Sequence, residues 1–328
     1  MRLLLIVNPF ASSVNARNRA AVEAALGAEH SLTVVETERR GHAVGLAEGA
    51  VAQGYDLVVV FGGDGTLNEA ANGLVAAGTA AAGAARDGAV ASTALAPLPG
   101  GSTNVLARTL GFTNNSKKAT AKLLAALHSP GTSIKRVGLG RVNDRYYLFN
   151  CGLGFDAAVV EMVEAHGSLK RKLGQPLFVY ATVATFARRY DRKHPHFDLA
   201  LRGGPDGERQ IKDAYFALCL KSNPYTFLGR IPLNVSPEAG LTKGISVTAF
   251  QKLGLGTILG VNTAAMTGRG GRRLAERSHI AYASDIASLT VRGHHPFKYQ
   301  MDGEFLGEAD TLEVSFSPDV LNLVVPGP

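Results

Sequence analysis

The chain has 328 residues, of which 46% are hydrophobic and 19% charged, with 38 glycines and no tryptophan. This length is too great for one small domain and favours two domains. The composition is typical of globular proteins. With 34 lysines and arginines against 27 aspartates and glutamates, the formal net charge is +7. A positive surface suits phosphates, an anionic membrane face or nucleic acid, and it is equally typical of a surface that only keeps a protein soluble.

The cysteines and the amino terminus limit the chemistry and the location. Cys151 and Cys219 have neither CxxC nor histidine-rich spacing, so we expect buried free thiols and no zinc site. Leu3–Val7 is apolar but ends in Asn8-Pro9, which predicts a buried strand rather than a signal peptide. No stretch has the roughly 18 uncharged apolar residues of a spanning helix. We therefore expect a cytoplasmic protein that would meet a membrane only from its inner face.

Strands and helices alternate in residues 1–130. The expected strands are Leu3–Val7, Ser31–Glu36, Asp56–Phe61 and Ala94–Pro99. The expected helices are Arg17–Leu26, Ala43–Gln53, Leu67–Val75, one that ends at Leu110, and Lys117–Leu127, with a helix end and a loose loop over Ala76–Ser92. This alternation is typical of a parallel sheet with helices on both faces, so we expect a Rossmann-like α/β domain.

Residues 131–305 have a different pattern, in which short apolar runs are separated by proline, glycine and asparagine. The expected strands of this second half are Ile134–Val142, Tyr146–Cys151, Phe197–Leu201, Ala214–Leu220, Ile245–Phe250, Ser288–Val291 and, beyond the domain limit, Leu312–Ser317. The expected helices are Phe178–Tyr190 and Leu255–Met266. We expect a β-rich and mostly antiparallel domain.

The strongest local signal is a glycine-rich turn that follows a buried strand and precedes a helix. It comprises Gly62, Gly63, Asp64, Gly65, Thr66, Leu67, Asn68 and Glu69. Glycines let phosphate oxygens approach main-chain amides, and the helix that follows favours negative charge at its start. Asp64 would repel phosphate, so we expect it to face Mg²⁺ or the attacking hydroxyl.

Two further turns follow strands of the same expected sheet. One is Pro99-Gly100-Gly101-Ser102-Thr103-Asn104, and the other is Asn8-Pro9-Phe10-Ala11-Ser12. Ser102 and Thr103 can bind phosphate or only cap a helix. The carboxyl ends of parallel strands meet at one edge, so the three turns should converge on one crevice. Neither glycine-rich turn has the spacing of a Walker P-loop or a dinucleotide fingerprint.

Taken together, these motifs resemble the diacylglycerol kinase catalytic-domain family, which includes bacterial diacylglycerol kinases and the sphingosine and ceramide kinases and is distantly similar to NAD kinases. Its Gly-Gly-Asp-Gly-Thr-x-Asn-Glu motif is matched in full by Gly62–Glu69, and its Pro-x-Gly-Thr-x-Asn motif by Pro99–Asn104 with Ser102 in place of threonine. Gly152–Ala157 resembles its middle signature, and Asp302-Gly303-Glu304 its late Asp-Gly-Glu.

The resemblance implies a nucleotide-binding domain over residues 1–130, a lipid-substrate domain over 131–305, and a final stretch, about 306–328, that returns to the first domain. It implies ATP with Mg²⁺ as cofactors, and Glu304, Asp302 and Asp64 as the catalytic residues, with Glu304 as proton acceptor. The ATP contacts that it implies, in the numbers of this chain, are Asn8, Pro9, Phe10, Ala11, Ser12, Thr37, Gly62, Gly63, Asp64, Gly65, Thr66, Leu67, Asn68, Glu69, Gly101, Ser102 and Asn104.

One segment departs from the family pattern. The family often binds an accessory Mg²⁺ through an Asp-Gly near a Pro-x-Ala segment, and here Pro237–Gly244 carries Lys243 at the position of that aspartate. An ammonium cannot ligate Mg²⁺. We therefore expect no accessory protein metal site in this segment.

Basic clusters indicate the expected partners. Four of them are Lys170–Lys172, Arg188-Arg189, Arg192-Lys193 and Arg272-Arg273. The first two flank the apolar part of Phe178–Phe186, which suits docking on an anionic bilayer but also suits a core helix with solvated ends. Nucleic acid is not expected, because no aromatic residues alternate with these charges. The expected partners are ATP and a lipid at a membrane surface, and a homodimer is compatible with the sequence.

Three functions stay open at this point. The first is a lipid kinase acting on diacylglycerol or on a sphingoid or ceramide-type lipid, which Leu67-Asn68-Glu69 and the pair Asp302 and Glu304 favour. The second is an NAD kinase-like enzyme. The third is a non-catalytic protein that binds nucleotide or lipid, suggested by Lys243.

Overall fold

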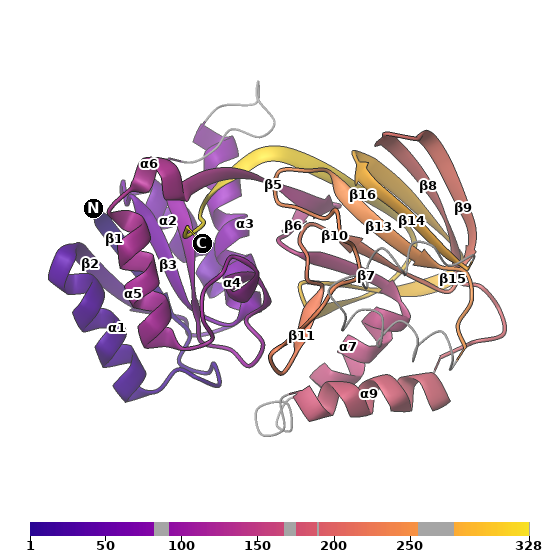
Figure 1. The fold of residues 1–328 in the computed structure, drawn as a ribbon, viewed down its shortest axis with the longest axis horizontal. Coiled ribbons are helices and arrows are strands. Elements are labelled where there is room, and N and C mark those ends of the chain that lie inside the picture. The colour runs from indigo at the N-terminus through magenta and orange to yellow at the C-terminus, as the bar shows by residue number, and fades with distance from the viewer. Residues whose placement is uncertain (82–91, 167–174, 189, 255–278, 328) are drawn as a thin grey trace. The chain divides into compact units, whose positions relative to one another are not determined.

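The structure is a computed structural model that describes residues 1–81, 92–166, 175–188, 190–254 and 279–327. They form two compact units, Met1–Leu139 with Ser317–Pro328, and Gly140–Phe316 (Figure 1). The domain limits expected from the sequence, residues 130 and 305, lie earlier in the chain than the unit boundaries after Leu139 and Phe316. The reason is that strands β5 (Ile134–Val142) and β16 (Glu304–Val324) each run from one unit into the other.

The first unit has a parallel sheet, as the sequence predicts. Its strands are β1 (Arg2–Val7), β2 (Ser31–Glu36), β3 (Leu57–Gly62) and β4 (Ala94–Pro99). Their order is β4-β3-β1-β2, and every neighbouring pair is parallel. Leu323, near the end of β16, pairs in the same direction with Leu95 of β4. All residues of β3 and β4 are buried, which explains their continuous apolar runs.

Helices cover both faces of this sheet. They are α1 (Ala16–Glu29), α2 (His42–Ala52), α3 (Asp64–Ala81), α4 (Val105–Thr109), α5 (Ser116–Leu127) and α6 (Pro130–Ser133). Helix α1 packs beside α5 and α2 beside α3, and the two pairs lie on opposite faces (Figure 1). A Cβ on Gly73 of α3 would lie 2.3 Å from the Val44 carbonyl oxygen, so only glycine permits this close helix contact.

The start of α3 differs from the prediction. The sequence predicts a helix that begins at Leu67 after a turn, whereas the structure begins it at Asp64. The Leu67 amide donates to the Gly63 carbonyl at 3.2 Å, so the helical hydrogen bonds begin directly after Gly63. The helix also continues past Val75 to Ala81, and the rest of the expected loop lies outside the described residues.

The second unit is a mostly antiparallel sheet, again as predicted. Besides β5 and β16, its strands are β6 (Arg145–Tyr147), β7 (Asn150–Gly154), β8 (Phe197–Gly204), β9 (Gly207–Ala214), β10 (Phe216–Leu220), β13 (Ile245–Phe250), β14 (Ile280–Ile286) and β15 (Ser288–Met301). The main order is β14-β13-β10-β7-β15-β16; β8 also pairs with β15, and β9 pairs with β8. A separate pair is β11 (Thr226–Leu228) with β12 (Ile231–Leu233).

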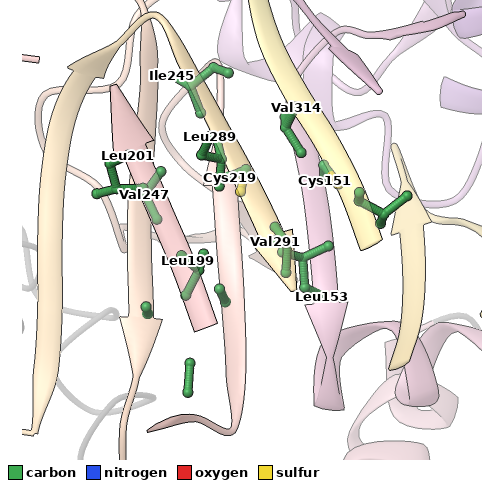
Figure 2. Packing of buried hydrophobic residues seen from close by; sticks show 14 of the residues in the cluster. Cys151, Leu153, Leu199, Leu201, Cys219, Ile245, Val247, Leu289, Val291 and Val314 are labelled. Carbon is green, nitrogen blue, oxygen red and sulfur yellow. The ribbon is translucent and has the colours of Figure 1, made fainter. Parts of the chain in front are cut away.

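The core of this unit is built from alternating residues of these strands. Figure 2 shows Leu199, Val247, Leu289 and others packed between the strands, with Cys151 and Cys219 among them. The two cysteines are buried and free, as expected for these thiols. Burial raises the pKa of the Cys219 thiol to about 12, so this thiol is inert as a nucleophile.

The described residues of the second unit include the helices α7 (Phe155–Ala165) and α9 (Gln175–Arg188). The sequence predicts the second but not the first. Phe155 of α7 contacts Phe186 of α9 edge to face, with ring centroids 6.5 Å apart. The expected helix Leu255–Met266 lies outside the described residues. No helix in the described part of the chain has the length and apolar character needed to cross a membrane.

The prediction of one strand over Tyr146–Cys151 is wrong. The structure divides it into β6 and β7 and leaves Leu148 and Phe149 out of both. The cause is a buried carboxylate, because the amides of these two residues donate to Asp302 rather than to a neighbouring strand. The sheet pattern is interrupted where that side chain enters.

Candidate functional site

The structure brings the three predicted turns together at one edge of the first unit's sheet. The Asn8 amide donates to the Phe61 carbonyl at 3.0 Å, and the Gly100 amide donates to the Gly62 carbonyl at 2.9 Å. The Ser13 amide donates to the Gly100 carbonyl at 2.8 Å. The turns after β1, β3 and β4 are therefore hydrogen-bonded to one another.

The glycines of the two glycine-rich turns are required by this close contact. A Cβ on Gly100 would lie 2.9 Å from the Gly62 Cα, and a Cβ on Gly101 would lie 2.9 Å from the Gly63 Cα. Any side chain at Gly100 or Gly101 would force the two main chains apart. The motif glycines thus fix how β3 and β4 end side by side.

Asn8 joins the first turn to the start of α3. Its Nδ2 donates to Thr66 Oγ1 at 2.8 Å, and its Oδ1 accepts the Phe10 amide at 2.9 Å. The Thr37 amide donates to the Val7 carbonyl at 2.8 Å, which places this buried threonine beside the same turn. The Phe10 side chain, in contrast, is 67% exposed.

Asp64 has a defined structural position. Its Oδ2 accepts the Val105 amide at 2.9 Å and its Oδ1 accepts the Leu106 amide at 3.2 Å. The carboxylate therefore caps the first turn of α4 and holds the third turn against α3. These α4 amides are occupied by Asp64, which leaves the start of α3 as the helix end that faces the turns.

Asn104 holds the third turn from within. It adopts a left-handed conformation with φ of 52°. Its Oδ1 accepts the Gly101 amide at 2.8 Å, and its Nδ2 donates to the Gly101 carbonyl at 2.8 Å and to Asn114 Oδ1 at 2.6 Å. Ser102, at the tip of the turn between them, is exposed.

The polar residues that end the long motif also hold helices. Glu69 Oε2 accepts the Ala43 amide at 3.3 Å, at the start of α2. Asn68 is buried, and its carbonyl accepts Asn72 Nδ2 at 2.9 Å. Leu67 is buried too, so these three predicted ATP contacts lie in the scaffold beneath the turns.

The residues at the surface of the joined turns are those suited to phosphate. Gly65 is exposed, as are Pro9, Ser12 and Ser102, and Ala11 is half-buried. The first-turn amides of an α-helix have no acceptor within the helix, so the start of α3 can donate to an anion. The first unit therefore presents amides and hydroxyls at one place, with Asp64, Glu69 and Asn104 fixing the backbone beneath.

A pocket of about 420 Å³ opens beside the first turn. It is lined by Val7, Pro9, Val14, Asn15, Ala16, Arg19, Ala20 and Glu23. Arg19 forms ion pairs there with Glu23, at 2.5 Å, and with Glu36. The volume lies in the range of small-molecule sites.

In the second unit, Asp302 is buried and fully engaged by main-chain amides. Its Oδ2 accepts the Leu148 amide at 2.7 Å, and its Oδ1 accepts the Phe149 amide at 3.0 Å and the Asn150 amide at 3.1 Å. Asp302 and Gly303 have φ of 49° and 80°, the geometry of a tight hairpin turn between β15 and β16. Asp302 thus positions this turn.

Glu304 follows that turn, and its side chain has a different partner from that of Asp302. Its side chain is 18% exposed and forms an ion pair with Arg145, which is 30% exposed. Arg145 was not predicted as a site residue, because it lies 159 positions away in the sequence and no local motif marks it. The pair leaves Glu304 an oriented carboxylate with access to solvent.

The middle signature is linked to the same turn by buried hydrogen bonds. Gln300 Nε2 donates to Asp156 Oδ2 at 2.7 Å, and Gln300 Oε1 accepts the Gly303 amide at 2.8 Å. The Tyr225 hydroxyl donates to Asp156 Oδ1. Burial raises the pKa of Asp156, and the two hydrogen bonds oppose that rise. A Cβ on Gly152 would lie 1.7 Å from Asp156 Oδ2, which explains that glycine.

A buried lysine contacts the segment Pro237–Gly244, in which the sequence predicts no accessory metal. Lys221 is 0% exposed. Its ammonium donates to the carbonyls of Lys243 and, at 3.4 Å, Gly240, and it lies 3.9 Å from the centroid of the Phe316 ring. Burial lowers the pKa of Lys221 to about 7, and the nearby charge of Asp285 opposes the change. The Lys221 side chain thus ties this segment to the end of β10.

This lysine makes stability depend on pH. An unfolded lysine keeps its proton up to about pH 10.5 whereas folded Lys221 loses it near pH 7, so above pH 7 the unfolded state binds more protons. We expect the unfolding free energy to rise by about 1.4 kcal/mol per pH unit from pH 7 to 9, relative to Lys221→Met. Urea unfolding at pH 7 and at pH 9 measures this change in unfolding free energy. Lys243→Met, which keeps the carbonyl contact, should behave like the unchanged chain, and equal pH slopes for all three would contradict the prediction.

The comparisons with known proteins agree with the motifs. A model of the diacylglycerol kinase catalytic domain matches residues 2–163. This part of the chain belongs to the diacylglycerol kinase catalytic-domain family, which confirms the resemblance. The chain is 28% identical over 318 residues to a Pseudomonas aeruginosa protein named "Probable lipid kinase YegS-like", covering 95% of this chain and 90% of that protein.

Two further matches cover different shares of the chain. A Chromohalobacter salexigens protein of the same name is 34% identical over 156 residues, covering 48% of this chain and 44% of that protein. A crystal structure of a diacylglycerol kinase from Bacillus anthracis str. Sterne superposes with a TM-score of 0.72 at 20% identity, covering 100% of this chain and 97% of that chain. At this identity the structural match supports the fold alone.

Proposed function

We propose that the protein is an ATP-dependent lipid kinase. It transfers the γ-phosphoryl group of ATP to the hydroxyl of diacylglycerol or a related lipid and gives a phosphatidic-acid-like product. The observation that carries the proposal is the joining of the turns after β1, β3 and β4 around the start of α3. The family match over residues 2–163 supports the same conclusion.

In this proposal the triphosphate binds at the exposed side of the joined turns. The α3 amides near Gly65 and the hydroxyls of Ser12 and Ser102 donate to phosphate oxygens. Mg²⁺, when bound, neutralises phosphate charge. Carboxylates suit Mg²⁺, and Asp64 would face the ion through the acceptor capacity that its bonds to the Val105 and Leu106 amides leave.

Glu304 is the proposed base. A lipid hydroxyl is a weak nucleophile until a carboxylate accepts its proton. As the hydroxyl oxygen bonds to the γ-phosphorus, the bond from that phosphorus to the bridging oxygen of ADP breaks, and the proton moves to Glu304. Arg145 orients the carboxylate through their ion pair, and Asp302 holds the turn that carries it.

Helix α9 is the proposed membrane-facing element, at the inner face of the membrane. Tyr180 and Val183 are three residues apart on this helix and both are 62% exposed. Nearby, the Arg192 guanidinium lies 4.7 Å from the Phe186 ring centroid. An exposed apolar face beside basic residues suits an anionic bilayer surface.

A double variant tests this face. Tyr180→Ser with Val183→Ser is expected to bind phosphatidylglycerol vesicles about tenfold more weakly, because two apolar side chains no longer enter the bilayer. Vesicle co-sedimentation measures the change, and activity on a short-chain lipid in detergent should stay the same. Tyr180→Phe with Val183→Leu keeps the apolar face and serves as the control. Equal vesicle binding by all three proteins would exclude α9.

The function itself is tested by one assay. Purified protein is incubated with labelled ATP, Mg²⁺ and, in separate reactions, diacylglycerol, sphingosine, ceramide or NAD. Label in diacylglycerol supports the proposal, and label in sphingosine or ceramide moves the acceptor to that lipid. Label in NADP would instead show an NAD kinase-like enzyme, and label in none of them would show a binding protein.

A further inference from the structure

A small cluster of metal-binding side chains lies in the second unit, on strands that no motif marks. Asp198 of β8, Asp213 of β9 and His294 of β15 each offer one ligand atom, and these three atoms all lie within 4.8 Å of one another. The cluster lies apart in sequence from the Asp-Gly-Glu turn and takes no part in the proposed phosphoryl transfer. One imidazole nitrogen and two carboxylate oxygens form a ligand set that divalent transition metals accept.

The strands are shaped to bring these side chains together. Along the β8–β9 ladder, Phe197 pairs with Ala214 and Leu199 with Ile211, so β9 has one extra residue in this interval. Asp213 lies in that bulge with φ of 58°. β15 leaves its ladder with β16 between Arg292 and Phe297, and His294 lies in that interval. Bulges re-aim side chains in this way beside functional sites.

Each ring nitrogen of His294 lies near an oxygen acceptor. Its Nδ1 lies 3.3 Å from the Pro195 carbonyl and its Nε2 lies 3.2 Å from Asp198 Oδ1. Both neighbours are acceptors, whereas a neutral imidazole has only one N–H. An Nδ1 that donates to Pro195 leaves the Nε2 lone pair facing the carboxylates, the arrangement of a metal-ligating histidine whose other nitrogen donates to a carbonyl.

The carboxylates are held in place, and in the described part of the chain neither has a lysine or arginine partner. The Asp213 amide donates to Asp198 Oδ1 at 2.8 Å, which orients the Asp198 side chain. Among the described residues, neither aspartate forms an ion pair with a lysine or an arginine, and His294 is the partner of Asp198. Two carboxylates this close favour a cation between them.

We propose that Asp198, Asp213 and His294 bind one Zn²⁺ ion, with water in the remaining position. Zinc accepts imidazole nitrogen and carboxylate oxygen in tetrahedral sites, whereas Mg²⁺ prefers six oxygen ligands. The ion would join the bulged part of β9 to β8 and β15, so it would stabilise the β8–β9 hairpin against the sheet.

The test is zinc binding by the full chain after removal of any affinity tag and treatment with EDTA. Isothermal titration should show one Zn²⁺ per chain, and Mg²⁺ at the same concentration should show none. X-ray absorption should show one imidazole nitrogen and oxygen ligands without sulfur, because both cysteines are buried in the core.

Three matched variants decide the assignment. Asp213→Asn suits the left-handed backbone, and Asp198→Asn keeps an acceptor for the Asp213 amide; each should weaken zinc binding about tenfold or more, as should His294→Gln. His295→Gln is the control, because its ring packs against His196 with centroids 4.7 Å apart and lies outside the ligand set. Circular dichroism verifies folding. Absence of stoichiometric zinc binding, or binding that these substitutions leave unchanged, would overturn the site and reduce the cluster to a salt bridge.

Discussion

Replacing Glu304 by glutamine is expected to reduce the rate of lipid phosphorylation by about 10²- to 10⁴-fold, the usual contribution of a general base. Glutamine keeps the size of the side chain and can still contact Arg145, but it cannot accept a proton. Because ATP would bind to the turns of the first unit, we expect KM for ATP to change little while kcat falls. Steady-state rates with labelled ATP and a diacylglycerol in detergent measure both constants.

The control for this experiment lies on the same strand. Glu308 of β16 is exposed, with one long contact to Lys298 at 3.9 Å, so Glu308→Gln should leave kcat within about twofold. Unchanged turnover in Glu304→Gln would remove this residue from the role of base. A folded variant that also loses ATP binding would show that Glu304 acts in binding rather than in proton transfer.

Replacing Asp302 by alanine is expected to destabilise the protein by about 3–5 kcal/mol. The substitution leaves the amides of Leu148, Phe149 and Asn150 buried without their acceptor. It also removes the side chain that separates β6 from β7, so the turn that carries Glu304 should lose its fixed position. Chemical denaturation measures the loss of unfolding free energy.

Two further variants make the result specific. Asp302→Asn keeps one acceptor oxygen and should fall between alanine and the unchanged chain. Asp310→Ala removes an exposed aspartate from the neighbouring strand and should change the unfolding free energy by no more than about 0.5 kcal/mol. If Asp302→Ala were as stable as Asp310→Ala, the three hydrogen bonds would not hold the turn as the structure indicates.

The parallel half of the fold was predictable because its signals are local. Ser31–Glu36 and Ala94–Pro99 have the same limits in the prediction and in the structure, since each run is bounded by residues that end a strand. Helix α7 was missed because the buried β7 runs straight into Phe155, and the apolar residues on both sides of the boundary hide the change from strand to helix.

The roles of individual side chains were harder to predict than their location. The motif places Asp64 in a glycine-rich turn, but the partners of its carboxylate are amides 41 and 42 residues further along the chain. Arg145, the partner of Glu304, is likewise distant from it in sequence. Asp198 and His294 of the proposed zinc site are also far apart in the sequence. Local patterns identify which segments converge, whereas only the fold shows which groups of those segments touch.

The capping of α4 by Asp64 affects how sequence comparisons should be used to find inactive relatives. Because an acid at this position is needed to keep two helices together, a relative that has lost phosphoryl transfer would still benefit from retaining it, and the same holds for Glu69 at the start of α2. A well-preserved glycine-rich signature therefore reports an intact scaffold. Under the proposed mechanism, the acid that corresponds to Glu304 is the position to inspect when separating working enzymes from those that only bind.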